Sequence, residues 1–405
     1  MLNFQRYDLR NAKPHSRTHY RTHQLHIAVC PNIPVESSQN GPDLKNRLLL
    51  RKSSLVPMPN LPIICKRPKI YALLLLFLLS QTLPSYAKVK FPVVYLTDLF
   101  HPYNDPDDHF DLAALYSVDQ FDLKGVIIDN TVHSKAPGII PVRQMNRITG
   151  KNVPVYVGLR SELRSPDDTG MDQQANQEGC LAILDILKNS RKKVTIITAG
   201  SLRDVAAAYN RDPELFSRKL DRLIIFAGEA ENTSFLEYNV ALDKNAYIRV
   251  MNSVKNIYWV PCFDSGPMKN KGLASFWQSR HSDLLKGASP AVTNYFLYAL
   301  SRSPDTLGYL SELNHPVDQS QLNQYITGSN VPVRYLWCCS VFPWFTKNRD
   351  FDFPFTFEPV TVVADPKAAV HYTDSGNKVM RFKITDLTHY SERMTTIFNT
   401  LIRKL

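Results

Sequence analysis

Excess positive charge is scarce in most of this sequence, although the whole chain carries a formal net charge of +11. Residues 1–87 hold 12 of its 48 Lys and Arg and 3 of its 37 Asp and Glu, so residues 88–405 keep 36 and 34, a net charge of +2. Proteins that bind nucleic acid through a basic face concentrate Lys and Arg on that face. The charge distribution therefore excludes this class of function for residues 88–405.

A long apolar run is missing as well. Ile70–Leu79 is a run of ten apolar residues, whereas a helix needs about 20 to cross a bilayer. It follows the basic stretch Cys65–Lys69 and precedes the small residues Ser85–Ala87, which is the order of a secretory signal peptide. We therefore expect no stable membrane anchor, and export to the periplasm or the extracellular space with cleavage after about Ala87.

Residues 1–57 lack sustained periodicity and are rich in His, Arg, Asn and Pro, which is typical of a disordered segment. Met58 to Ala87 alone has the ordinary length of a signal peptide. Either Met58 is the true start, which we favour, or the first 57 residues are a disordered extension. We therefore divide the chain into a non-native or disordered extension (1–57), a signal peptide (58–87) and a single domain (88–405).

Cysteine is sparse, with six residues in the chain, of which Cys180, Cys262, Cys338 and Cys339 lie in residues 88–405. An oxidising compartment allows a disulfide between them but does not require one. The adjacent pair Cys338 and Cys339 does not have the spacing of a zinc site. We expect buried thiols.

Short apolar runs alternate with helical patterns over the first two thirds of residues 88–405. The runs that predict strands are rich in β-branched and aromatic residues and cover 91–98, 123–129, 153–158, 193–200, 221–228 and 257–262. This alternation predicts an α/β fold with an open, mostly parallel, doubly wound sheet. Residues 354–365 and 378–387 predict a late antiparallel strand pair. In such folds the functional site lies at the carboxyl ends of the parallel strands.

Acidic residues are concentrated where the first predicted strand is followed by a helix, in TDLFHPYNDPDDHFDLAAL. These acids repel one another and are costly to remove from water, so we expect a positive group among them. Carboxylates without His or Cys suit Ca²⁺, which takes about 6–8 oxygen ligands. The alternative, that Asp107 or Asp108 only caps the helix, explains one acid but not the cluster. The acids are Asp98, Asp105, Asp107, Asp108 and Asp111.

Polar residues also follow the other predicted strands, and we expect them to face the same crevice. Asn and Glu side chains in such a place suit the hydroxyl groups of a sugar. The polar residues are Asp129, Asn130, Thr198–Ser201, Glu231, Asn232, Glu237 and Asn239.

The order of these motifs resembles the nucleoside hydrolase family of the inosine–uridine-preferring type. The acidic loop is similar to that family's DxDPGxDD loop with residues inserted, and LKGVIIDN is similar to its second strand, which ends in Asn. VTIITAGSLRDVAAA resembles its TGPLTNIA turn, and FLEYNVALDKNAYIRVMNS its AEFNxxxDPEAA segment. The resemblance covers residues 91–266 in register and implies a nucleoside hydrolase-like fold.

The resemblance also implies roles for single residues. It implies that Asp107 and Asp108 are Ca²⁺ ligands, with the backbone carbonyl of Ala199 as a third. The general base that activates water is then Asp98, and Asp105 is its rival because it precedes a proline as the family's base does. The residues implied to bind ribose are Asn130, Asn232, Glu237 and Asn239.

The implied protein is an exported hydrolase that cleaves the N-glycosidic bond of a ribonucleoside or related riboside with a Ca²⁺-bound water. A homo-oligomer is left open. The sequence departs from the family at the late His–Asp pair, whose place by spacing is Tyr335–Phe345, where there is neither acid nor His. His315 or Asp318 are the candidate substitutes. The departure keeps two alternatives open: a non-catalytic protein that binds a sugar or nucleoside, and a hydrolase of another glycoside.

Overall fold

Side chains of the first strand, β1 (Phe91–Thr97), point alternately into two hydrophobic cores. Val93 and Tyr95 pack into one core, and Val94 and Leu96 pack into the other. All four are fully buried. Alternation with both faces covered is the mark of a strand at the centre of a doubly wound sheet.

The computed structural model describes residues 90–405, except 104, 131–137, 174, 232–233 and 347–349. The predicted extension at 1–57, the signal peptide at 58–87 and the ribose-binding candidate Asn232 lie outside the described residues. The described residues cluster as one compact unit. In the described part of the chain, no helix combines the length and the apolar character that crossing a membrane requires.

The described residues form a nine-stranded sheet, in the order β10-β9-β11-β6-β5-β4-β1-β2-β3. The six strands from β3 to β6 in this order pair in parallel, and so do β11 and β6. The late pair, β9 and β11, is antiparallel, and β10 extends it. The predicted fold class is confirmed. Besides β1, the strands of this sheet are β2 (Phe121–Ile128), β3 (Val155–Val157), β4 (Val194–Ala199), β5 (Leu220–Phe226), β6 (Ile257–Val260), β9 (Phe355–Ala364), β10 (Val370–Tyr372) and β11 (Asn377–Ile384).

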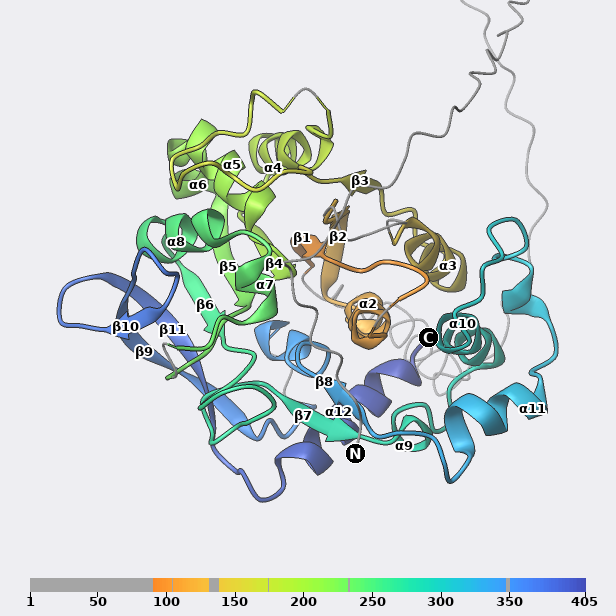
Figure 1. The fold of residues 1–405 in the computed structure, drawn as a ribbon. Coiled ribbons are helices and arrows are strands. Elements are labelled where there is room, and N and C mark those ends of the chain that lie inside the picture. Colours follow the sequence, from red (N-terminus) through yellow and green to blue (C-terminus); the bar gives the residue numbers. More distant parts are fainter. Residues whose placement is uncertain (1–89, 104, 131–137, 174, 232–233, 347–349) are drawn as a thin grey trace, which may run out of the picture. The chain divides into compact units, whose positions relative to one another are not determined.

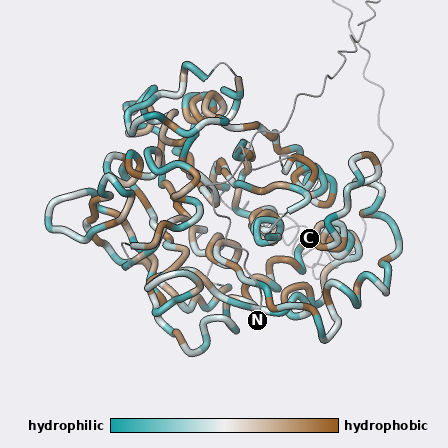
Figure 2. The backbone as a smooth tube through the Cα atoms, in the orientation of Figure 1, coloured by the Kyte–Doolittle hydropathy of each residue, from teal (hydrophilic) through white to brown (hydrophobic). Residues whose placement is uncertain are grey.

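Helices cover both faces of the sheet, as Figure 1 shows. One face packs against α4 (Glu178–Asn189), α5 (Arg203–Arg211), α6 (Pro213–Lys219) and α8 (Lys244–Ser253). The other packs against α2 (Asp107–Ser117), α3 (Ile139–Thr149), α10 (Pro290–Leu300) and α12 (Tyr390–Ile402). Figure 2 shows hydrophobic segments along the central strands and hydrophilic ones along outer loops.

The segment between β6 and β9 contains several short elements, and its buried side chains contribute to the core on the second of these faces. They include a separate antiparallel pair, β7 (Trp277–Ser279) and β8 (Arg334–Leu336), which the sequence did not predict. The short helices are α9 (His281–Leu284) and α11 (Gln319–Leu322), and α7 (Tyr238–Ala241) follows β5. Single turns of 3-10 or π helix lie at Glu312–Asn314, Asn323–Thr327 and Phe342–Thr346.

Candidate active site

The carboxyl ends of β1, β2 and β4 meet at one point, as the parallel pattern predicts. The Asp98 amide donates to the Ala199 carbonyl at 3.4 Å, and the Asp129 amide donates to the Thr97 carbonyl at 2.8 Å. The Ser201 amide donates to the Asp129 carboxylate at 2.7 Å. The ends of three neighbouring strands are therefore joined by hydrogen bonds between their last residues.

Gly200 makes this convergence possible. A Cβ atom at this position would lie 2.7 Å from the Asp98 amide nitrogen and 3.0 Å from the Asp129 carboxylate. The first distance is shorter than a Cβ atom tolerates and involves backbone that cannot move aside easily, while the second is a tight contact. The TAGS turn therefore has glycine because the strand ends approach so closely.

Asp107 and Asp108 open α2, directly beside the end of β1. The Asp108 carboxylate accepts a hydrogen bond from the Thr97 hydroxyl at 2.8 Å. Pro106 is the N-cap residue, and no side chain caps this helix. The side chains of the two acids therefore do not serve as the helix cap, although their charges still favour the helix dipole.

The electrostatics of these acids are unfavourable without a positive partner. Loss of hydration raises the pKa of Asp98 well above its usual range, and the nearby charges of Asp129 and Glu237 raise it further. Burial likewise raises the pKa of Asp108, helped by Asp98 and Asp107. A cation among these carboxylates would favour their charged forms and relieve the repulsion.

The rival base, Asp105, has different surroundings. Its side chain is 49% exposed and forms an ion pair with Arg334, with 2.7 Å between the nitrogen and the oxygen. Asp105 thus lies at the solvent side of the loop with a cation of its own, whereas Asp98 lies among the other acids. The two candidates for the base therefore differ in exposure and in the charges around them.

Glu237 and Asn239 are held by their own chain. The Glu237 carboxylate accepts from the amides of Gly228, Asn239 and Val240 at 2.8–3.3 Å, which makes it the N-cap of α7. The Asn239 side chain donates to the Phe226 carbonyl at 3.0 Å, at the end of β5. Each carboxylate or amide oxygen retains lone pairs for a sugar hydroxyl. Asn130 follows Asp129 and is half-buried.

The predicted metal ligands have suitable chemistry but are not assembled into a metal site. Asp107, Asp108 and the Ala199 carbonyl all offer the hard oxygen atoms that Ca²⁺ prefers. Among the described residues, however, no group of three or more His, Cys, Asp and Glu side chains is arranged to hold a metal ion. One further buried oxygen, Oδ1 of Asp111, has no hydrogen-bond partner among these residues and adds to the donor set.

The sequence interpretation gave no role to Asp111. It is 1% exposed, and burial raises its pKa to about 7, although the neighbouring Cys338 side chain and Cys339 backbone lower the pKa. Its position four residues after Asp107 on α2 was the available signal, because residues at this spacing share a helix face. An acid between the buried Phe110 and Leu112 was a second signal.

The segment where a late His–Asp pair was expected instead carries Cys338 and Cys339 as buried free thiols, as predicted for the cysteines. The candidate substitutes have other roles, since the Asp318 carboxylate caps α11 and His315 pairs with Glu312 at 3.4 Å. Both line a separate cavity of about 300 Å³.

The two tryptophans of this segment have different neighbours. Trp344 packs on Tyr258 and Phe357, which is a core role. Trp337 is half-buried and meets the rings of Phe263 and Phe276, with centroids 5.8 and 5.6 Å away. It therefore packs against a small separate cluster that also contains Cys262.

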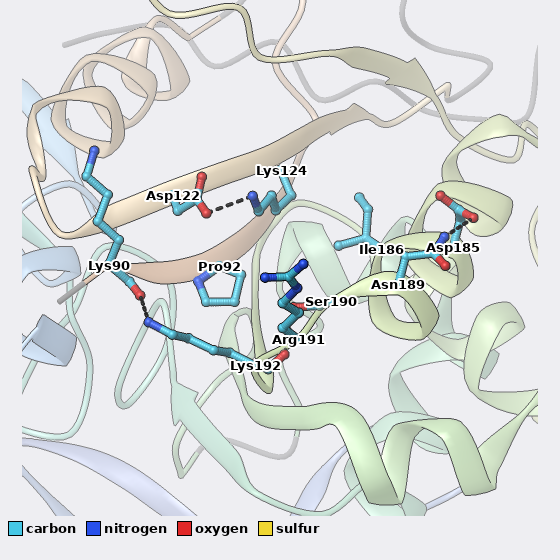
Figure 3. A pocket seen from close by; sticks show the side chains of 10 residues that line it. All are labelled: Lys90, Pro92, Asp122, Lys124, Asp185, Ile186, Asn189, Ser190, Arg191 and Lys192. Atoms are coloured by element: carbon cyan, nitrogen blue, oxygen red, sulfur yellow. Dashed lines mark hydrogen bonds and ion pairs between the residues drawn. The ribbon is translucent and has the colours of Figure 1, made fainter. Parts of the chain in front are cut away.

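A cavity of about 480 Å³ lies at the opposite end of the sheet, beside the amino ends of β1, β2 and β4. Figure 3 shows Asp122 paired with Lys124, and Lys192 donating to the Lys90 carbonyl. Ligands of open parallel sheets bind at the carboxyl ends, so this cavity is not the predicted site. Another cavity, of about 350 Å³, includes Tyr103 and Arg334 next to Asp105.

Comparison with known proteins supports the resemblance. Residues 103–301 match the family model described as inosine-uridine preferring nucleoside hydrolase. The match includes Asp107, Asp108 and Glu237, begins after Asp98, and ends before Tyr335–Phe345. The search of curated proteins found no match.

Solved structures with low sequence identity are also similar. An inosine-uridine preferring nucleoside hydrolase from Bacillus anthracis is 16% identical, with a TM-score of 0.49, and the alignment covers 78% of this chain and 100% of that one. The plant nucleoside hydrolase PpNRh1 is 14% identical, with a TM-score of 0.49 and coverage of 77% and 99%. The type III effector protein XopQ, solved with adenosine diphosphate ribose, is 14% identical, with a TM-score of 0.46 and coverage of 84% and 99%.

Proposed function

Since the chain is a divergent relative of the nucleoside hydrolase family, we propose that it hydrolyses the N-glycosidic bond of a ribonucleoside or related riboside. The family match supports a glycosyl hydrolase-type enzyme in general. The observation that carries the finer proposal is that Asp98, Asp108 and Ala199 all adjoin the end of β1: the Thr97 hydroxyl donates to the Asp108 carboxylate at 2.8 Å, and the Asp98 amide donates to the Ala199 carbonyl at 3.4 Å. Carboxylates at this place can hold a cation and take a proton from water, which are the two roles that the proposed hydrolysis gives them.

The cofactor we propose is Ca²⁺, held by Asp107, Asp108 and the backbone carbonyl of Ala199. When bound, it would polarise a water molecule and anchor the ribose hydroxyls. The remaining contacts to ribose are assigned to Asn130, Asn232, Glu237 and Asn239. Of these, Glu237 and Asn239 are held in place by backbone groups, which favours recognition of one sugar orientation.

Asp98 is the proposed general base. Its carboxylate takes a proton from the attacking water while the water oxygen forms a bond to the anomeric carbon. In the same step the bond between the anomeric carbon and the leaving nucleobase or aglycone breaks. Positive charge develops on the sugar in this step, and the surrounding carboxylates stabilise it.

The leaving group receives no proton from the segment Tyr335–Phe345, which lacks an acid or a His. We therefore propose that the enzyme favours substrates whose aglycone leaves readily without protonation. A general acid contributes about 10²–10⁴-fold to such reactions, so poor leaving groups should react more slowly by a factor in this range.

The test is ribose release from p-nitrophenyl riboside and from a nucleoside panel, with the purified protein and its variants. We expect the nitrophenyl compound to react at least about 100-fold faster than inosine. Asp98→Asn should lower kcat by at least about 100-fold, while Asp105→Asn stays close to wild type because Asp105 is paired with Arg334 at the surface.

Other outcomes would change the assignment. If Asp105→Asn were inactive and Asp98→Asn active, Asp105 would be the base. If no compound released ribose, the second candidate function would be favoured: a non-catalytic protein that binds a sugar or nucleoside, or a hydrolase of another glycoside. The observation behind that candidate is the presence of Cys338 and Cys339 where the family has its late His–Asp pair.

Export is part of the proposal. The basic stretch, short apolar run and small residues before Lys88 support a signal peptide that is cleaved after about Ala87. Export would bring the crevice to nucleosides or ribosides outside the cytoplasm.

A further inference from the structure

The cavity of about 350 Å³ beside Asp105 has a positively charged lining. The described residues that line it include Arg302, which follows the end of α10, and Arg334, which opens β8, but no Asp or Glu. Tyr103, from the loop between β1 and α2, also lines it. The cavities of about 480 and 300 Å³ differ from it, because acidic side chains line both of them. The lining of this cavity therefore suits an anion.

An aromatic ring holds the Arg302 side chain in place. The guanidinium carbon of Arg302 lies 4.8 Å from the centroid of the Tyr103 ring. The Tyr103 hydroxyl donates to the Leu300 carbonyl at 3.0 Å, which fixes the ring on the end of α10. Stacking uses the flat face of a guanidinium, whereas its N–H groups lie in the plane and point outward from the edge. The stacked arginine is therefore oriented to donate to a ligand at that edge.

The backbone at Arg302 has a conformation that usually belongs to glycine. Its φ is +55°, in the left-handed region. The Arg302 amide donates to the Ala299 carbonyl at 2.9 Å, and the Ser303 amide donates to the Tyr298 carbonyl at 3.1 Å. This pair of hydrogen bonds ends a helix with a left-handed residue, most often glycine. Because arginine is costly at such a position, the helix end does not by itself explain this side chain.

Two neighbours fix Arg334 at the same cavity. Its Nε donates to Nε2 of His281 at 3.1 Å, and its Nη1 donates to the Asp105 carboxylate at 2.7 Å. These contacts use two of the five N–H groups of a guanidinium. Asp105 is 49% exposed and offsets part of the Arg334 charge. Burial raises the pKa of Tyr103, and the charges of both Arg302 and Arg334 lower it, so the two cations act on one group.

Guanidinium groups bind phosphate through paired hydrogen bonds, and a phosphate monoester carries about 1.5–2 negative charges at pH 7. Resting on the proposed function, we propose that this cavity binds the phosphate group of a phosphorylated riboside, so that riboside phosphates are the substrate class. Asp108 adjoins the end of β1, and Asp105, three residues earlier, pairs with Arg334 beside the cavity. With the ring hydroxyls of ribose held in the crevice, the exocyclic 5-hydroxyl is the position from which a phosphate can extend out of it.

The test is calorimetric titration of ribose 5-phosphate, ribose and inorganic phosphate into the purified full-length protein. Ribose 5-phosphate is the expected product of the hydrolysis, so its binding is measured without turnover. It should bind at least about tenfold more tightly than ribose or inorganic phosphate. Arg302→Gly should lower its affinity to that of ribose, while the urea midpoint of unfolding stays close to that of wild type, because glycine suits the backbone there.

Lys124→Met is the matched control, because Lys124 lines the cavity at the opposite end of the sheet and its loss lowers the net charge equally. This variant should bind ribose 5-phosphate as wild type does. Equal losses in Lys124→Met and Arg302→Gly would overturn the inference, and so would equal affinities of the wild type for ribose 5-phosphate and ribose. Inorganic phosphate that bound as tightly as ribose 5-phosphate would overturn the assignment to the substrate. The proposed function fails on a different result, the lack of ribose release from every riboside.

Discussion

His281 is a buried histidine whose two nitrogen atoms have different partners. Its Nδ1 lies 2.7 Å from the Tyr325 carbonyl, and its Nε2 lies 3.1 Å from Nε of Arg334. The arginine nitrogen is the donor, so Nε2 must carry a lone pair and the ring is neutral. Burial lowers the pKa of His281 to about 4.

This pKa predicts a pH dependence of stability. The unfolded histidine takes up its proton near pH 6.5 and the folded one near pH 4, so the unfolded state binds more protons between these values and stability falls on acidification. Between pH 7 and pH 4, the unfolding free energy of wild type should therefore fall by about 2–3 kcal/mol more than that of His281→Gln. Urea unfolding at several pH values measures this, and His315→Gln, an exposed position, is the control. Parallel pH profiles for wild type and His281→Gln would contradict the assignment.

The positions of some candidate site residues could be predicted from the sequence, whereas their contacts often could not. The meeting of Asp98 with Asp108 follows from an apolar strand that runs into an acidic loop and a helix, and such local patterns can be read from sequence. The three backbone donors on Glu237 could not be read in this way, because they depend on the path of the loop after β5. Asp111 could be placed on the correct helix face, but not against Cys338, which is more than 200 residues later in the chain.

At the scale of elements, Arg203 joins three segments of the chain. It opens α5, and its side chain forms an ion pair with Asp243 at 3.0 Å, with both side chains nearly fully buried. It also donates to the carbonyls of Leu159 and Arg160 at 3.0 Å and of Leu242 at 2.6 Å. The end of β3 and the start of α8 are thereby tied to the helix that follows the TAGS turn.

Replacing Arg203 should therefore be costly. Removing one partner of a buried ion pair destabilises a protein by about 3–5 kcal/mol, because the other charge remains buried. We expect Arg203→Met to lose this much unfolding free energy in urea. Arg218→Met is the control, since its pair with Glu214 is exposed and such pairs contribute about 0–1 kcal/mol. Equal losses in the two variants would show that the buried pair has no special role.

The elements that were missed share one property, which is shortness. β7, β8 and β10 have three residues each, too few to display a period of two. β11 was predicted as one strand of an antiparallel pair, but its parallel pairing with β6 was not. That pairing joins segments far apart in the sequence and depends on packing rather than on local pattern.

At the scale of the whole molecule, the two hydrophobic cores in the part of the chain that the structure describes extend from Val93 to Ile402. We therefore expect residues 88–405 to fold alone, with a Tm within about 2 °C of the full chain, equivalent to less than about 1 kcal/mol. Thermal unfolding of both forms checks this.

N-terminal mass analysis of exported protein should find Lys88 as its first residue, and a retained residue 1 would contradict the proposed cleavage.

The thiols of residues 88–405 have a practical consequence. All four cysteines are free and buried, and burial raises the pKa of Cys180 to about 12 and that of Cys338 well above its usual range. Alkylating reagents attack the exposed thiolate, so the folded protein should resist modification until it opens. Cys180 lies in one hydrophobic core and Cys338 in the other. Their separate labelling rates would therefore report how often each face of the sheet opens in solution, without any probe having to be introduced.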